Sequence, residues 1–238
     1  MEALVLAGGL GTRLGPLTKS IPKPMLPVGG RPFLEWQLEF LAEQGVRRFI
    51  LSVGYLGEKI RAHFGDAFRK AEIVYSPETS PLGTAGAVIH SLPLVTEENL
   101  LVIDGDTFQR LSLANLYEDH ELHEADATLA IFHGPASASA NLAEVNADER
   151  IQHIYRGRKG GRRLSPLLSG TSLIRTEALR NAASSPDAAE LRSLENDLIP
   201  ILIRDGRVFA HVSAAPYLDI GRPESYKTAA DRLKELRA

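Results

Sequence analysis

Short apolar runs alternate with amphipathic segments through the first 110 residues of the chain. The apolar runs at residues 2–6, 48–53, 73–75 and 100–103 are typical of strands, and the last has the purely apolar character of a fully buried parallel strand. Between them, the spacing of apolar side chains and the stop signals predict helices at residues 33–44, 56–64 and 84–92. Strands and helices in alternation predict an α/β fold with a doubly wound, mostly parallel sheet.

The pattern becomes less regular after residue 112. It predicts helices at residues 113–124, 191–203 and 223–236, strands at 127–132, 167–174 and 208–212, and a hairpin formed by 143–145 and 151–155. The sequence contains no internal repeat and no long linker. We therefore expect a single domain over residues 1–238, in which a Rossmann-like N-terminal half (1–112) is completed by a C-terminal half (113–238).

The composition is that of a globular protein, with 44% hydrophobic and 24% charged residues among 238. A net charge of -3 argues against nucleic acid and against a membrane surface as partners. Because the chain has no cysteine, disulfides, zinc–thiolate sites and a cysteine nucleophile are excluded. No apolar run approaches the roughly 18 residues of a membrane span, and the N-terminus lacks a signal-peptide pattern, so we expect a cytoplasmic protein.

A glycine-rich stretch, residues 6–14, follows the first predicted strand directly. Gly8, Gly9 and Gly11 allow a tight turn in which backbone N–H groups face a common point, and such a concavity binds anions. Arg13 adds a guanidinium that can form two parallel hydrogen bonds to phosphate oxygens. The stretch predicts a phosphate-binding loop, with an ordinary strand-to-helix turn as the alternative.

Charged residues at three other places suit the same chemistry. Lys23 lies between Pro22 and Pro24, which stiffen the backbone around its ammonium group. Asp104 and Asp106 follow a buried strand, where carboxylates can hold Mg²⁺ together with phosphate oxygens and water. Asp219 comes late in the chain and would supply a second carboxylate to that metal. The alternatives are a solvated loop lysine and a turn in which the aspartates act as caps.

Four motifs in this order resemble the signature of the sugar-1-phosphate nucleotidyltransferases, and they run nearly from end to end. They are Leu6-Ala7-Gly8-Gly9-Leu10-Gly11-Thr12-Arg13-Leu14 with Pro22-Lys23-Pro24-Met25-Leu26-Pro27-Val28, then Pro81-Leu82-Gly83-Thr84-Ala85-Gly86, Asp104-Gly105-Asp106, and Tyr217-Leu218-Asp219-Ile220-Gly221. The resemblance implies an enzyme that joins a nucleoside triphosphate to a sugar 1-phosphate and releases pyrophosphate, with Mg²⁺ as cofactor. These two substrates are the expected partners, and the sequence leaves assembly into a homo-oligomer open.

The resemblance also implies roles for individual residues. It assigns residues 1–112 to the nucleotide, with contacts from Leu6, Ala7, Gly8, Gly9, Gly11, Thr12, Glu78, Pro81, Gly83 and Thr84. Arg13 would stabilise the departing β- and γ-phosphates and Lys23 the phosphates at the reaction centre, which makes both catalytic. Asp106 and Asp219 would hold Mg²⁺.

Residues 113–238 are assigned to the sugar, and here the sequence departs from the family. The implied sugar-binding residues are Asp104, Gly105, Glu144, Lys159, Gly170 and Glu195. Asn141 stands where relatives have glycine, and no Glu-Lys pair is found near the basic stretch 156–163. Arg156, Arg158 and Lys159 are therefore alternative candidates for the cation that holds the sugar phosphate.

The base and the sugar are predicted from two further features. A carboxylate only accepts hydrogen bonds, so Glu78 suits the adjacent N1–H and N2–H donors of guanine better than uracil or thymine. The alternative is a solvent-facing loop glutamate. Asp104-Gly105-Asp106-Thr107-Phe108 and Ser193-Leu194-Glu195-Asn196-Asp197 are most similar to the guanylyltransferases of D-glycero-D-manno-heptose 1-phosphate. Mannose 1-phosphate as acceptor, UTP or dTTP as donor, and a catalytically silent regulatory relative are the other readings.

Overall fold

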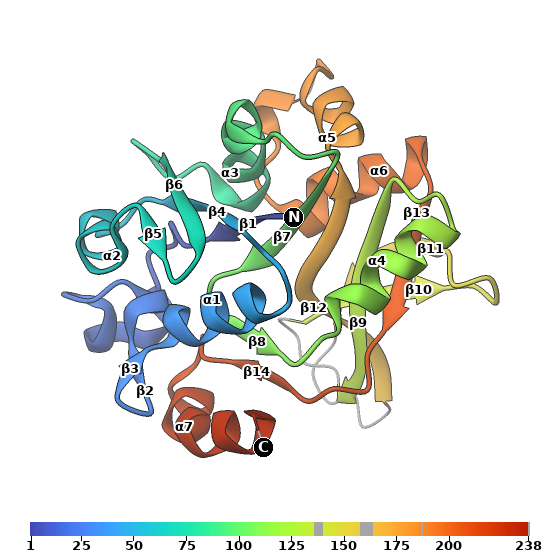
Figure 1. Ribbon diagram of the computed structural model, residues 1–238. Helices are drawn as coiled ribbons and strands as arrows, with labels where there is room; N and C mark the ends of the chain where they lie inside the picture. The colour runs from blue at the N-terminus through green and yellow to red at the C-terminus, as the bar shows by residue number, and fades with distance from the viewer. Residues whose placement is uncertain (136–139, 158–163, 187, 238) are drawn as a thin grey trace.

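A ten-stranded sheet forms the centre of the computed structural model, which describes residues 1–135, 140–157, 164–186 and 188–237 (Figure 1). The strands lie in the order β11-β10-β12-β7-β1-β4-β6-β5, with β9 beside β12 and β13 beside β9. Their bounds are β1 (Glu2–Leu6), β4 (Arg48–Val53), β5 (Ala67–Phe68), β6 (Ala71–Pro77), β7 (Asn99–Asp104), β9 (Ala127–Pro135), β10 (Asn141–Val145), β11 (Ile151–Arg156), β12 (Leu164–Arg175) and β13 (Val208–Val212).

The middle of the sheet is parallel and its outer strands are mostly antiparallel. β7, β1, β4 and β6 run in one direction, with Leu6 opposite both Ser52 and Asp104. β12 lies antiparallel beside β7, and β10 and β9 lie antiparallel beside β12. The carboxyl ends of the parallel strands therefore meet at one edge, which is where ligands bind on open α/β sheets.

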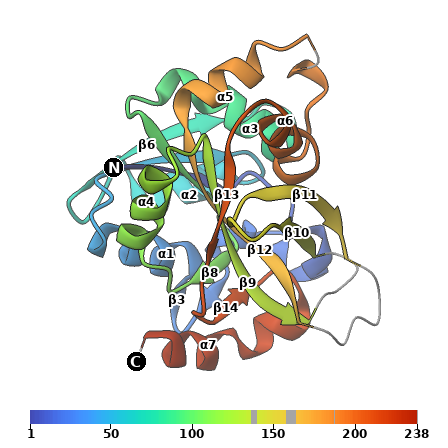
Figure 2. The ribbon, with the colours of Figure 1, turned by 90° about the vertical axis from the view of Figure 1, so that its right-hand side faces the viewer.

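Helices cover both faces of the sheet, and the period-two alternation of the strands decides which residues meet them. On β1, Leu4 packs with α3 (Gly83–Ser91), α5 (Thr176–Ala183) and α6 (Ile199–Asp205), which lie together in Figure 2. Its neighbours Ala3 and Val5 pack with α1 (Phe33–Glu43), α2 (Gly57–Phe64) and α4 (Leu113–Leu122). The predicted α/β fold with a mostly parallel, doubly wound sheet is confirmed.

A smaller layer closes the strand-end edge. β8 (Thr107–Gln109) pairs antiparallel with β14 (Tyr217–Asp219), so that Asp219 lies opposite Thr107. The last helix, α7 (Pro223–Arg237), lies beside this pair in Figures 1 and 2. Its buried Ala229 and Leu233 pack with Leu218 and with Phe108. The chain thus brings residues about 110 positions apart to one end of the sheet.

The helix predicted over residues 191–203 is confirmed only from Leu194 onward, and its first turn is not α-helical. Residues 194–198 form a π-helical turn (η5), and α6 begins only at Ile199. Asp197 accepts hydrogen bonds from the backbone N–H groups of Arg192 (2.9 Å) and Ser193 (2.7 Å), which hold the preceding backbone in an extended conformation. Pro200 stands in the first turn of α6, where proline is tolerated.

Other elements were not expected from the pattern. The hydrophobic pattern predicts no helix at α5, which is only eight residues long. The proline-rich residues 12–32 form the 3₁₀ helices η1 (Thr12–Thr18) and η2 (Lys23–Met25) and the short strands β2 (Pro27–Val28) and β3 (Arg31–Pro32). Among the described residues, no helix combines the length and apolar character needed to cross a membrane.

Candidate active site

Two adjoining cavities open at the carboxyl ends of the parallel strands. The first cavity, of about 500 Å³, is lined by all the residues predicted for the nucleotide and by both predicted catalytic residues: Leu6, Ala7, Gly8, Gly9, Gly11, Thr12, Arg13, Lys23, Glu78, Pro81, Gly83 and Thr84. The second cavity, of about 590 Å³, lies on the side of β12. Arg13, Asp104 and Asp106 line both cavities and form their common wall.

The glycine-rich loop needs glycine at two positions for different reasons. Gly11 has a φ of +65°, in the left-handed region, and begins η1. Gly8 lies so close to the Glu78 carboxylate that a side chain at position 8 would collide with it. The loop is also tied to its neighbours, since Thr18 Oγ1 donates to the Gly11 carbonyl at 3.0 Å and Tyr55 N donates to the Gly8 carbonyl at 3.2 Å.

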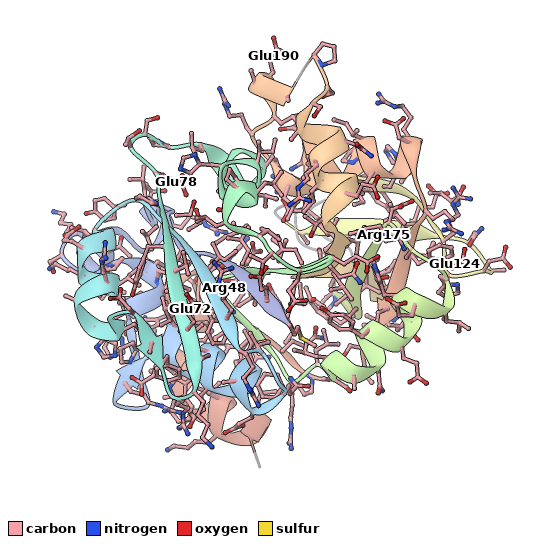
Figure 3. All side chains as sticks on the ribbon, turned by 45° about the horizontal axis from the view of Figure 1, so that its top comes forward. Arg48, Glu72, Glu78, Glu124, Arg175 and Glu190 are labelled. Carbon is pink, nitrogen blue, oxygen red and sulfur yellow. The ribbon has the colours of Figure 1, made fainter. Side chains whose placement is uncertain are left out.

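Glu78 is a fixed carboxylate at the wall of the first cavity. It follows the carboxyl end of β6, and Figure 3 shows it at the opposite end of that strand from Glu72. Ser52 Oγ donates to Glu78 Oε1 at 2.8 Å, and Leu82 N donates to Oε2 at 3.2 Å. Each carboxylate oxygen has a further lone pair, so the group can accept two more hydrogen bonds from a ligand.

The segment after Glu78 is tied to the region of η5. Gly83 has a φ of +76°, and a side chain there would collide with the Arg192 carbonyl. Ala85 N donates to that carbonyl at 3.1 Å, and Leu194 N donates to Thr84 Oγ1 at 2.7 Å. The wall of the first cavity and the backbone that carries Glu195 are therefore held together directly.

Opposite charges converge where the two cavities meet. The Lys23 ammonium forms an ion pair with Asp106. A Cβ atom at Gly221 would lie 2.6 Å from Asp219 Oδ1, 2.8 Å from Lys23 Nζ and 3.0 Å from Arg13 Nη2, so these three groups surround that glycine. Burial lowers the pKa of Lys23 to about 8, the charge of Asp219 opposes this shift and the charge of Arg13 adds to it.

Asp104 is a second perturbed group in the common wall. Burial raises the pKa of its carboxyl to about 8, the charges of Glu195 and Asp219 add to the shift, and Lys23 opposes it. Gly170 has a φ of +74°, and a Cβ atom there would lie 2.5 Å from Asp104 Oδ2. Gly170 therefore lets β12 pass close to the carboxyl group of Asp104.

The structure brings some of the residues predicted for the sugar into the second cavity and not others. Asp104, Gly170 and Glu195 line it. Gly105 does not; it packs on the glycine-rich loop, where its N–H donates to the Leu6 carbonyl at 3.0 Å. Glu144 is exposed on β10 and lines neither cavity, because successive side chains of a strand face opposite ways.

Only one of the three candidates for the cation that holds the sugar phosphate lies within the described residues. Arg156 lines the second cavity. Arg158 and Lys159, the other two candidates, lie outside the described residues, and their assignment stays a prediction.

The second cavity also contains polar residues to which the sequence analysis gave no role. Asn141 lines it, and its Oδ1 atom is buried with no hydrogen-bond partner among the described residues. Tyr217 lines it and stacks on Phe132 with ring centroids 4.6 Å apart. Arg222 and Arg232 lie at the same cavity. Tyr217 belongs to the late aspartate motif and Arg222 follows it directly, so both could have been found there. No pattern marks Arg232, which α7 brings to the cavity.

The two aspartates predicted for the metal fit a magnesium ion in their chemistry. Asp106 and Asp219 both line the second cavity and offer hard oxygen donors. Among the residues that the structure describes, no group of three or more His, Cys, Asp or Glu side chains gathers around one point. Mg²⁺ commonly binds through one or two carboxylates, with phosphate oxygens and water as its remaining ligands, so a two-carboxylate site suits it.

Comparison with known proteins places the chain in a family. The family described as nucleotidyl transferase matches residues 2–235. The chain belongs to this family. The resemblance to sugar-1-phosphate nucleotidyltransferases that the motifs indicated is confirmed.

Individual relatives of this nucleotidyl transferase cover nearly its whole length. A D-glycero-alpha-D-manno-heptose 1-phosphate guanylyltransferase of Aneurinibacillus thermoaerophilus is 33% identical over 234 residues, covering 98% of this chain and 99% of the relative. A mannose-1-phosphate guanylyltransferase of Mycobacterium tuberculosis is 30% identical over 229 residues, covering 95% of this chain and 62% of the relative. The crystal structure of HddC from Yersinia pseudotuberculosis complexed with GMP-PN has a TM-score of 0.82 at 29% identity, covering 98% of this chain and 99% of HddC.

Proposed function

We propose that this nucleotidyl transferase transfers GMP from GTP to a sugar 1-phosphate, forming a GDP-sugar and pyrophosphate, and that the sugar is D-glycero-D-manno-heptose. The observation that carries the proposal is the pair of cavities that share Arg13, Asp104 and Asp106. A triphosphate in the first cavity and a sugar phosphate in the second would meet at that wall. The near full-length similarity to a heptose 1-phosphate guanylyltransferase supports the choice of substrates. We also propose that residues 1–112 and 113–238 act as the nucleotide and sugar halves of one domain.

The reaction brings two anions together, so the chain has to offset negative charge and fix orientation. An oxygen of the sugar phosphate attacks the α-phosphorus of GTP, and the bond from that phosphorus to the pyrophosphate oxygen breaks. Arg13 donates hydrogen bonds to the leaving β- and γ-phosphates, and Lys23 leaves its ion pair with Asp106 to contact the phosphates at the reaction centre.

Members of the family typically use a divalent metal. We propose that Asp106 and Asp219 would hold Mg²⁺, which would supply positive charge to offset the negative charge that develops on the phosphates. The residues fit this role in their donor chemistry and in their place at the second cavity.

Selection of guanine is assigned to Glu78. Its two oxygens are held by Ser52 and Leu82, and each retains an acceptor site for the N1–H and N2–H groups of the base. Uracil and thymine would place a carbonyl oxygen against one of these carboxylate oxygens. The predicted preference is therefore for GTP over UTP and dTTP.

Mannose 1-phosphate is the second candidate for the acceptor, because a mannose-1-phosphate guanylyltransferase is 30% identical to the chain. In the second cavity, Asp104, Asn141 and Glu195 supply polar groups suited to sugar hydroxyls. The contact predicted for Glu144 has no support in this geometry.

Pyrophosphate release with a matrix of four nucleoside triphosphates and several sugar 1-phosphates tests the proposal. The expected result is turnover with GTP and D-glycero-D-manno-heptose 1-phosphate, in the presence of Mg²⁺ and abolished by chelation. Faster turnover with mannose 1-phosphate would favour the second acceptor. No turnover with any pair, together with GTP binding in the absence of a sugar phosphate, would instead indicate a silent regulatory relative.

A further inference from the structure

Gln37 on α1 holds the turn that carries Asp106. Its side-chain amide donates two hydrogen bonds, from Nε2 to the Asp104 carbonyl at 2.8 Å and to the Thr107 carbonyl at 2.7 Å. These two carbonyls bracket the Asp104-Gly105-Asp106-Thr107 turn. Because both partners are acceptors, the amide nitrogen must face them, and both of its hydrogens are used. Gln37 is only 3% exposed and lines neither of the two large cavities.

Two backbone hydrogen bonds connect the turn to the rest of the site. Gly105 N donates to the Leu6 carbonyl at 3.0 Å, which joins the turn to the glycine-rich loop. Ile220 N donates to the Asp106 carbonyl at 3.0 Å, which joins it to the segment after Asp219. A rotation of this turn would therefore change the direction of the Asp106 carboxylate relative to Asp219 and to the phosphate loop.

Within the described part of the chain, the amide combines two paired hydrogens with one unpaired oxygen. Its Oε1 atom is buried and has no hydrogen-bond partner among the described residues. Leaving a buried acceptor unpaired costs about 1–3 kcal/mol, which is comparable to the net gain of about 0.5–1.5 kcal/mol from each of two neutral hydrogen bonds. An apolar side chain of the same length would avoid that cost but would withdraw the donor from both carbonyls, so its effect would fall on the 104–107 turn.

We propose that Gln37 is a positioning residue for the metal site: its amide fixes the 104–107 turn, and through the turn the direction of the Asp106 carboxylate. The proposal rests on the proposed function, in which Asp106 and Asp219 hold a divalent cation. Residues behind the ligands of a metal typically change its affinity by about 10- to 100-fold when they are replaced.

Gln37→Met tests the proposal, since it removes both donors and keeps the side-chain length. Gln44→Met is the matched control. Gln44 ends the same helix, its Oε1 atom accepts from Leu113 N at 2.9 Å, and its Nε2 atom is buried without a partner among the described residues. Binding of Mn²⁺ to each protein is measured by electron paramagnetic resonance with GTP present and no sugar phosphate, so that no turnover contributes.

We expect Mn²⁺ to bind about 10- to 100-fold more weakly to the Gln37→Met protein and unchanged to the Gln44→Met protein. Hydrogen exchange gives a readout that needs neither metal nor nucleotide: the amides of Gly105 and Ile220 should exchange faster in Gln37→Met only. If the methionine variant does not fold, Gln37→Asn retains an amide too short to reach both carbonyls and should give the same two changes.

Two outcomes separate this inference from the proposed function. Mn²⁺ affinity and amide exchange of the Gln37 variant within twofold of wild type would overturn the positioning role while leaving the guanylyltransferase proposal intact. A wild-type protein that binds no Mn²⁺ with GTP would overturn the proposed function. The exchange of Gly105 and Ile220 in the variant would then still decide whether Gln37 holds the turn.

Discussion

Replacing Glu78 with glutamine changes one atom of the base-binding wall and should weaken its preference for guanine. In the wild-type chain both carboxylate oxygens accept, from Ser52 Oγ and from Leu82 N. In the variant, the amide oxygen has to face Leu82 N, because a backbone N–H cannot accept. The amide nitrogen then faces the Ser52 hydroxyl, which can rotate and accept instead. The structure thus fixes the orientation of the new amide.

This orientation sets the size of the effect. One of the two guanine donors still finds the amide oxygen, while the other meets an N–H₂ group. The loss is about one hydrogen bond to a charged acceptor, or about 1.5–3 kcal/mol. At 1.4 kcal/mol for each factor of ten, kcat/KM for GTP should fall by about 10- to 150-fold. Uracil and thymine, which offer a donor beside an acceptor, should be used better by the variant than by the wild type.

The assay is pyrophosphate release with GTP, UTP, dTTP and ATP at a saturating sugar 1-phosphate, comparing kcat/KM for each donor. Glu72→Gln is the control, because Glu72 is exposed at the other end of β6 and pairs with Arg48 at a nitrogen–oxygen distance of 3.0 Å (Figure 3). It should leave all four ratios unchanged. An unaltered GTP preference in Glu78→Gln would refute the assignment of the base to this wall.

Three further experiments test the roles of Asp219, Lys23 and His120. Asp219→Asn keeps an acceptor for Gly221 N, so the thermal midpoint should hold while most Mg²⁺-dependent turnover is lost; full activity would contradict a metal role. Burial lowers the pKa of Lys23 to about 8, so its positive charge is present below that pH and lost above it. The value of kcat/KM for GTP should therefore fall by about tenfold per pH unit above pH 8. A pH profile of kcat/KM that stays flat to pH 9.5 would contradict this. Burial lowers the pKa of His120 to about 4, so on acidification the unfolded chain takes up a proton before the folded chain does. The free energy of unfolding should therefore drop by about 1.4 kcal/mol per pH unit from pH 6.5 to 4 because of this group. Urea titrations at several pH values measure it, and the same pH dependence of the unfolding free energy in wild type and His120→Gln would be the contrary result.

Most of the parallel core of the fold was predictable because β1, β4 and β7 are largely apolar on both faces. The residues of β1, β4 and β7 belong to short apolar runs ended by polar or glycine residues, and the helices between them have clear stop signals. α5 was missed because it is short, and the helix expected at 191–203 begins only at Leu194 because Asp197 accepts from the backbone N–H groups of Arg192 and Ser193. Such a local competition between side chain and backbone leaves no mark in hydrophobic spacing.

The same contrast applies to the candidate site. The first cavity is built from contiguous motifs, so the sequence could predict all its principal residues. The second cavity is assembled from β10, β12, β14 and α7, whose proximity depends on the long-range fold. Arg232 could not be predicted for that reason. Glu144 was predicted from the family resemblance, yet the alternation of β10 directs it away from the cavity that Asn141 lines.

The tie between Gly83, Thr84 and the backbone at Arg192 and Leu194 has a consequence for how this enzyme could be altered. Donor and acceptor specificity are often treated as separate modules that can be exchanged between relatives. Here the segment behind the base and the segment carrying Glu195 share hydrogen bonds and a contact that only glycine permits. A chimaera that replaces one segment alone would lose the fit between the two segments. Substitutions in the two segments should therefore have non-additive effects, and a change of specificity would require both segments from the same relative.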